Sequence, residues 1–303
     1  MVVCRRFLLS CAALVILSLG HIPGVALAEV PSDWTAPQKP FHIAGNLYYV
    51  GSRDLAAYLI VTPAGDILLN ANLATSSPQI RSSVRALGYH WRDIKILLLS
   101  QPHYDHAAGA AQVLRETGAK LMVMAGDAEV VEAGDAHDFG GRELLPYTPA
   151  HVTRVLHDGD TIALGGTVLT AHKTAGHSSG CTTWTLDVPL NGQPRHVVIV
   201  GGYAALSSYR LVATPTQPAS YPGIAQDFEH TFAELRALPC DIFLGAHGSY
   251  FGMQQKLARL SIEGSKVWID PAGYRQMIAE AEKQFKTKLA AQQATALRQP
   301  SRR

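Results

Sequence analysis

The sequence predicts an α/β fold in which two β-sheets pack face to face with helices on both outer faces, a four-layer αββα sandwich. Short apolar segments typical of strands and amphipathic segments of helical periodicity follow one another in the order strands, helices, strands, helices. The 303 residues are 47% hydrophobic and only 17% charged, so the chain can bury a full core and is too apolar for intrinsic disorder. One compact domain is therefore expected.

The first residues have the pattern of a secretory signal peptide. Two arginines precede the apolar residues 7–19, and a small-x-small end at Ala28 follows. The apolar run is shorter than the roughly 20 residues that a membrane-spanning helix needs. We therefore expect residues 1–28 to be removed, residues 29–303 to form a single domain, and the mature protein to be periplasmic or secreted without a membrane anchor.

Two cysteines, Cys181 and Cys240, remain after removal of the predicted leader, which contains the other two. An oxidising compartment permits a disulfide between them, but only if their distance allows it. The formal net charge of +2 is too small to favour nucleic acid or an anionic membrane as a partner.

Short strands and one helix are expected in the first hundred residues. The apolar segments 41–50, 57–62 and 67–70 are broken by turns rich in glycine and proline, which indicates an antiparallel start. Residues 77–88 have apolar positions at helical spacing, with proline just inside the start and glycine just past the end, and predict a helix. Residues 94–100 are almost uninterruptedly apolar, as in a strand buried on both faces.

The rest of the chain continues the alternation. Further helices are expected over residues 107–117, 127–132, 224–238 and 271–293, and further strands over residues 120–124, 152–156, 161–164, 168–173, 182–188, 196–200 and 241–244. Hairpin turns rich in Asp, Asn and Gly separate several of these strands. Two longer segments, 134–148 and 201–223, contain many Gly and Pro residues and are candidate rims of a site.

A dense polar cluster follows the strand at residues 94–100. Gln101, His103, Asp105 and His106 lie within six residues, after a strand that ends in a strand-to-helix connection at a sheet edge. Two imidazoles, a carboxylate and an amide so close together are typical of a metal site.

Two distant histidines extend this cluster. His177 follows the strand at 168–173 and His247 follows the strand at 241–244, and both are flanked by small residues that leave room for an ion. Any one of them alone would be an ordinary loop histidine, but together with the cluster they predict metal binding.

With these residues the sequence resembles the metallo-β-lactamase superfamily, whose hallmark is His-x-His-x-Asp-His followed by two distant histidines. More narrowly it resembles subclass B3 of the class B β-lactamases. The resemblance covers roughly residues 41–260, with supporting stretches in the same order at residues 54–60, 67–70, 176–184, 209–212 and 245–251. It implies the metallo-β-lactamase fold, which is an αββα sandwich.

The resemblance also implies two zinc ions. The implied ligands are Gln101, His103 and His177 for the first ion and Asp105, His106 and His247 for the second. A zinc-bound hydroxide would open the ring of a small-molecule β-lactam, while the second ion would anchor the substrate and stabilise the ring nitrogen. Asp105 is the implied catalytic residue, because it would hold a zinc and orient the nucleophile.

Two departures from the family pattern affect this expectation. Gln101 stands where the family usually has His, although Gln is known at this place within the subclass. Because a neutral amide oxygen is a poorer zinc ligand than imidazole, the first zinc should bind more weakly. Tyr203 and Ala205 occupy places where the subclass usually offers serines to the β-lactam carboxylate. The residues then expected to bind that carboxylate are Tyr203, Ser207, Ser208 or Arg210.

Two other functions are compatible with the same residues. A related superfamily hydrolase could act on a lactone, ester or thioester, but such enzymes usually bridge their metals with an aspartate from the strand end that corresponds to residues 200–205. That stretch contains no Asp, Glu or Cys. The second alternative is a secreted zinc-binding protein without catalysis, which the Gln101 and Tyr203 substitutions motivate. The favoured prediction is β-lactam hydrolysis.

Overall fold

The computed structural model describes residues 30–134, 138–140 and 145–298. The predicted signal peptide, with its two cysteines, and parts of the predicted rim at 134–148 lie outside these residues. The chain from Pro31 onward forms one compact unit. Among the helices of the described ranges, none is long and apolar enough to cross a membrane.

In the described part of the chain, the first sheet has seven strands in chain order. They are β1 (Phe41–Ala44), β2 (Leu47–Tyr49), β3 (Tyr58–Ile60), β4 (Asp66–Leu69), β5 (Ile94–Leu98), β6 (Lys120–Met124) and β7 (Arg154–Leu156). Neighbours are antiparallel from β1 to β4 and parallel from β4 to β7. The carboxyl ends of the parallel strands therefore lie at one edge, where the polar cluster after β5 begins.

The expectation of one strand over residues 41–50 is wrong, because a hairpin turn divides it. Gly45 has a φ of 54°, a left-handed conformation that glycine adopts without steric cost, and the chain reverses there. A side chain at this position would also collide with Pro189, since a Cβ would lie 2.7 Å from its Cδ.

The second sheet has five strands among the described residues, in the order β12-β11-β10-β9-β8. They are β8 (Thr161–Leu164), β9 (Thr167–Lys173), β10 (Thr182–Leu190), β11 (Gln193–Val200) and β12 (Ile242–Gly245). Only β11 and β12 pair in parallel. Strands β9, β11 and β12 consequently end at the same edge, and the loops that carry His177 and His247 start there. A bond from Thr182 N to Ser100 O (2.8 Å) joins this edge to the end of β5.

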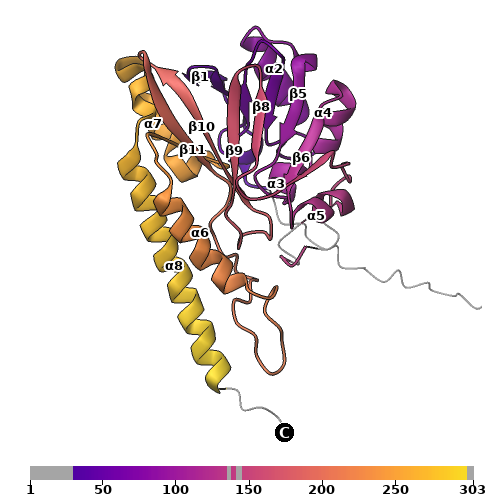
Figure 1. The fold of residues 1–303 in the computed structure, drawn as a ribbon, viewed down its shortest axis with the longest axis vertical. Helices are drawn as coiled ribbons and strands as arrows, with labels where there is room; N and C mark the ends of the chain where they lie inside the picture. Colours follow the sequence, from indigo (N-terminus) through magenta and orange to yellow (C-terminus); the bar gives the residue numbers. More distant parts are fainter. Residues whose placement is uncertain (1–29, 135–137, 141–144, 299–303) are drawn as a thin grey trace, which may run out of the picture. The chain divides into compact units, whose positions relative to one another are not determined.

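Helices cover both sheets, and the predicted four-layer αββα sandwich is confirmed (Figure 1). Near the first sheet lie α2 (Ser77–Ala86), α4 (Ala110–Thr117) and α5 (Ala128–Ala133); near the second lie α6 (Ile224–Ala237), α7 (Met253–Glu263) and α8 (Pro271–Arg298). Two short helices, α1 (Ser32–Thr35) and α3 (Tyr104–Ala107), and the helix α7 are absent from the sequence-based expectation.

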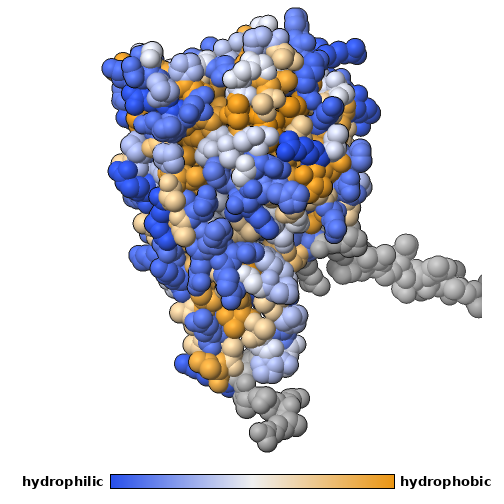
Figure 2. Space-filling model, viewed as in Figure 1, coloured by the Kyte–Doolittle hydropathy of each residue, from blue (hydrophilic) through white to orange (hydrophobic). Residues whose placement is uncertain are grey.

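The alternation of side chains along β5 divides the apolar core. Leu97 packs in the cluster between the first sheet and its helices, whereas Leu98 packs in the cluster that also contains Trp184 of the second sheet. This two-sided burial explains why residues 94–100 are so uniformly apolar. Figure 2 shows separate apolar areas among hydrophilic ones on the face in view.

An aromatic contact fixes the outer helices of the second sheet. Phe232 on α6 is fully buried, with its ring 5.7 Å from that of Phe285 on α8. We expect Phe232→Ala to lower the free energy of unfolding by about 3–5 kcal/mol, because it leaves a cavity. The matched control is Ile262→Ala on α7, which removes an 86% exposed side chain and should change the same quantity by less than about 0.5 kcal/mol. Urea denaturation of both variants measures this, and similar losses would contradict the packing role.

Candidate metal centre

Three predicted ligands converge where the two sheets meet. Asp105 and His106 lie on α3, and His247 follows β12. Asp105 Oδ2 lies 3.2 Å from His106 Nε2 and 3.4 Å from His247 Nε2, and the two nitrogens are 3.2 Å apart. Among the described residues, these three side chains form a group whose ligand atoms lie close enough together to hold one metal ion. We call Asp105, His106 and His247 the second ligand set.

The helix α3 was not expected, and it places two of these ligands on one helical turn. The sequence placed the whole cluster on a loop before a helix at residues 107–117, whereas Asp105 and His106 lie inside a helical turn. His103 N-caps that turn, and its carbonyl accepts hydrogen bonds from His106 N and Ala107 N. A rigid turn therefore holds both ligand side chains.

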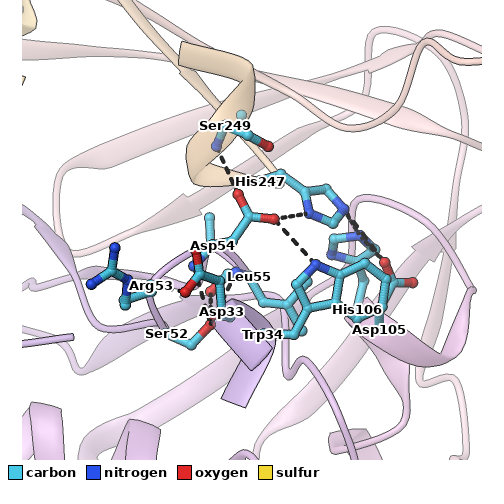
Figure 3. Close-up of polar contacts among 12 residues, drawn as sticks. Asp33, Trp34, Ser52, Arg53, Asp54, Leu55, Asp105, His106, His247 and Ser249 are labelled. Atoms are coloured by element: carbon cyan, nitrogen blue, oxygen red, sulfur yellow. Dashed lines mark hydrogen bonds and ion pairs between the residues drawn. The ribbon is translucent and has the colours of Figure 1, made fainter. Parts of the chain in front are cut away.

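Asp54, in the loop between β2 and β3, supports the second ligand set (Figure 3). Its Oδ2 accepts a hydrogen bond from His247 Nδ1 (2.9 Å) and one from Trp34 Nε1 (3.2 Å), and its Oδ1 accepts one from Ser249 N (2.8 Å). With Nδ1 engaged, His247 presents Nε2 to the other ligands. This carboxylate-histidine pairing is the usual support of a metal-binding imidazole.

The contacts within the second ligand set, and its contact with Asp54, shift the pKa values of its side chains. Burial alone would raise the pKa of Asp105, but the neighbouring His106 and His247 hold it well below its ordinary value. Burial would lower the pKa of His247, but Asp105 and Asp54 raise it to about 9. Burial lowers the pKa of His106 despite Asp105. The carboxylate is therefore ionised at neutral pH and can compensate a cation.

The first predicted ligand set is more loosely defined. The rings of His103 and His177 lie 4.8 Å apart between centroids. Gln101 is 2% exposed, and its Oε1 has no hydrogen-bond partner among the described residues, which fits an oxygen that serves an ion. His177 Nδ1 forms a hydrogen bond with Ala204 O (2.7 Å), so Nε2 is the ring nitrogen left to bind a metal ion. Burial, with a further effect of the neighbouring His103, lowers the pKa of His177 to about 3, so the ring of His177 is neutral.

Two buried side chains hold the loop of His177. Tyr209 donates its hydroxyl hydrogen to His177 O (2.5 Å). Asp127, beside α5, accepts hydrogen bonds from Ser178 Oγ (2.7 Å) and Gly180 N (2.6 Å). Burial raises the pKa of Asp127 to about 7 in spite of these bonds. Neither residue was predicted to support this loop, although Tyr209 begins the stretch 209–212 that contributed to the family resemblance. Nothing in the local sequence distinguishes such supports from ordinary core positions.

The four residues predicted to bind the substrate carboxylate differ in their surroundings. Tyr203 is half-buried, with its ring 4.6 Å from that of Tyr250, which lies 4.9 Å from the ring of His247. Ser207 is exposed, and Ser208 Oγ donates to Gly140 O (3.1 Å). Arg210 is exposed, and its Nε donates to Pro218 O (2.8 Å). Among these four, ring contacts connect Tyr203 to the second ligand set.

The two cysteines that the sequence left available for a disulfide are both free. Cys181 is buried and Cys240 is half-buried. The Cys181 thiol lies 3.5 Å from Gly202 O, and burial raises its pKa.

Comparisons with known proteins agree with this geometry. Residues 53–188 match the family described as the metallo-beta-lactamase superfamily. The native FEZ-1 metallo-beta-lactamase from Legionella gormanii is 43% identical, with a TM-score of 0.82 over 85% of this chain and 98% of the other. BJP-1, a subclass B3 metallo-beta-lactamase of Bradyrhizobium japonicum, is 34% identical, with a TM-score of 0.80 over 87% and 98%.

A third similar structure is the class B3 di-zinc metallo-beta-lactamase LRA-12 from an Alaskan soil metagenome. It is 36% identical, with a TM-score of 0.79 over 84% of this chain and 96% of the other. Fold, sequence identity and the convergence of the predicted ligands lead to one conclusion. This chain belongs to the metallo-β-lactamase superfamily.

Proposed function

We propose that this protein is an exported zinc-dependent β-lactamase that hydrolyses the cyclic amide of β-lactam antibiotics. The observation that carries the proposal is the second ligand set, in which a carboxylate and two imidazoles meet within 3.4 Å in a chain 43% identical to a known metallo-β-lactamase. The predicted leader at residues 1–28 supports export.

The residues of this chain have distinct proposed roles. Zinc, when bound, would activate water near neutral pH and polarise the lactam carbonyl. Gln101, His103 and His177 would hold the first ion, and Asp105, His106 and His247 the second. Asp105 would also orient the attacking water, because its buried carboxylate stays ionised between two imidazoles.

Tyr203 is the proposed partner of the substrate carboxylate. A phenol keeps its hydrogen at neutral pH and can donate it to an anion, and burial, with a smaller effect of Asp54, raises the pKa of Tyr203 further. Ser207, Ser208 and Arg210 remain secondary candidates, since Ser208 and Arg210 already bond backbone carbonyls. Trp34 would add an apolar wall, with its ring 5.5 Å from His247 and 6.1 Å from Tyr104.

The end of β11 argues against a metal-bridging carboxylate of the kind found in related ester hydrolases. A Cβ at Gly202 would lie 2.6 Å from the ring of His177, so a longer side chain there would displace a predicted ligand. β-Lactam hydrolysis is therefore better supported than hydrolysis of a lactone, ester or thioester.

Ring opening is the first test. Purified mature protein, incubated with a penicillin and a carbapenem in excess zinc, should consume both, as followed by loss of lactam absorbance. Asp105→Asn should reduce kcat/KM by at least about 100-fold, because the second ion loses its anionic ligand and the water its orientation. Asp187→Asn, at an exposed hydrogen bond with His196, is the control and should leave the rate unchanged. Absence of hydrolysis by the parent protein with full zinc would refute the proposal.

Zinc content is the second test. After dialysis against zinc-free buffer, the second ligand set should remain occupied and the first only in part, because an amide oxygen replaces an imidazole at Gln101. Gln101→His should strengthen binding at the first set by roughly 10-fold or more, by supplying a third imidazole. Metal analysis and zinc titration measure both. Two equally tight ions in the parent protein, or an unchanged titration in the variant, would contradict the assignment of Gln101.

A further inference from the structure

A buried contact that the sequence did not predict involves one ligand of the first set. Asp138 Oδ2 lies 2.9 Å from His103 Nε2, and the two side chains are only 2% and 3% exposed. Taking a carboxylate so far from water costs free energy unless a partner compensates it. The contact is therefore a built feature of the site rather than a chance surface pairing.

Neighbouring side chains hold the short segment that carries Asp138. The ring of Phe139 packs between those of Tyr209 (5.0 Å) and Tyr221 (4.9 Å). Gly140 O accepts a hydrogen bond from Ser208 Oγ (3.1 Å). Since Tyr209 also bonds the backbone of His177, one group of residues fixes both Asp138 and a second predicted ligand.

The other predicted ligand histidines show how such a pair functions. His247 bonds Asp54 through Nδ1, and His177 bonds a backbone carbonyl through Nδ1, so each presents its other ring nitrogen as a donor. In His103 the ring nitrogen beside a carboxylate is Nε2, which lies 2.9 Å from Asp138 Oδ2. Imidazole ligands of metals commonly have a partner of this kind, which fixes the ring and raises its basicity.

We propose that Asp138 is a positioning residue of the first zinc site, and that it compensates there for the weak ligand Gln101. This inference rests on the proposed zinc-dependent function. Gln101, His103 and His177 supply no anionic donor, whereas the second set contains Asp105. The carboxylate of Asp138 orients His103 and places a negative charge close to the ion. Asp54 has the corresponding role beside the second set.

Two isosteric substitutions, Asp138→Asn and Asp54→Asn, test the proposed role because each should weaken a different zinc site. Asp138→Asn should weaken zinc binding at the first site by about 10–100-fold and leave the second unchanged, and Asp54→Asn should do the reverse. Competition with a chromophoric chelator measures both dissociation constants, and the absorption spectrum of the cobalt-substituted protein reports the ligand field of each site. Asp138→Glu, which keeps the carboxylate, should retain more of the affinity than Asp138→Asn.

Asp187→Asn is the matched control, because Asp187 pairs with His196 at 2.6 Å on the exposed surface. It should change neither constant. In the Gln101→His background, Asp138→Asn should cost less affinity, since a third imidazole already holds the ion. Unchanged first-site affinity in Asp138→Asn, or equal weakening of both sites, would overturn the inference. These readouts do not involve β-lactam turnover, so a failure of the proposed function would be seen separately, as loss of hydrolysis with intact zinc binding.

Discussion

The contact between Asp54 and His247 joins the two halves of the sandwich at the candidate metal centre. Asp54 belongs to the first sheet's β2–β3 loop and His247 to the end of the second sheet's β12. Beside their side-chain bond, Gly248 N donates to Asp54 O (2.6 Å) and Ala56 N donates to Ala246 O (2.9 Å). Backbone hydrogen bonds hold the two sheets together at this point. The second ligand set is therefore supported by the rigid core and not by a loop alone.

The two ligand sets differ in charge, and the difference organises the rest of the site. The second set contains the ionised Asp105, and the ionised Asp54 supports it by a hydrogen bond to His247. Burial would raise the pKa of Asp54, but its hydrogen bonds and the neighbouring His247 lower it to about 2. The first set contains no acidic side chain. The carboxylates beside it, Asp138 at His103 and Asp127 under the His177 loop, come from outside the motif. In the proposed first site, the carboxylate of Asp138 beside His103 compensates for the neutral amide of Gln101.

Much of this arrangement could be predicted from the sequence, because periodic apolar strands and a compact ligand motif are local signals. The strand over residues 120–124 and the helix that begins at Ile224 were placed correctly, and so were the sandwich layers. The hairpin at Gly45 was missed, since a glycine between two apolar runs does not by itself show whether the chain reverses. The short helix α3 was missed because its polar residues resemble a loop.

The sequence alone determined the type of fold and the candidate ligands, since both depend on residue types at fixed spacings. It could not identify Asp54, Asp127 or Asp138 as supports, because a carboxylate acts as one only through the atoms that folding places beside it. It also could not distinguish Tyr203 from Ser208 and Arg210, which share a loop but face different neighbours. Tertiary structure decided which side chains meet, because those contacts join segments that lie far apart along the chain.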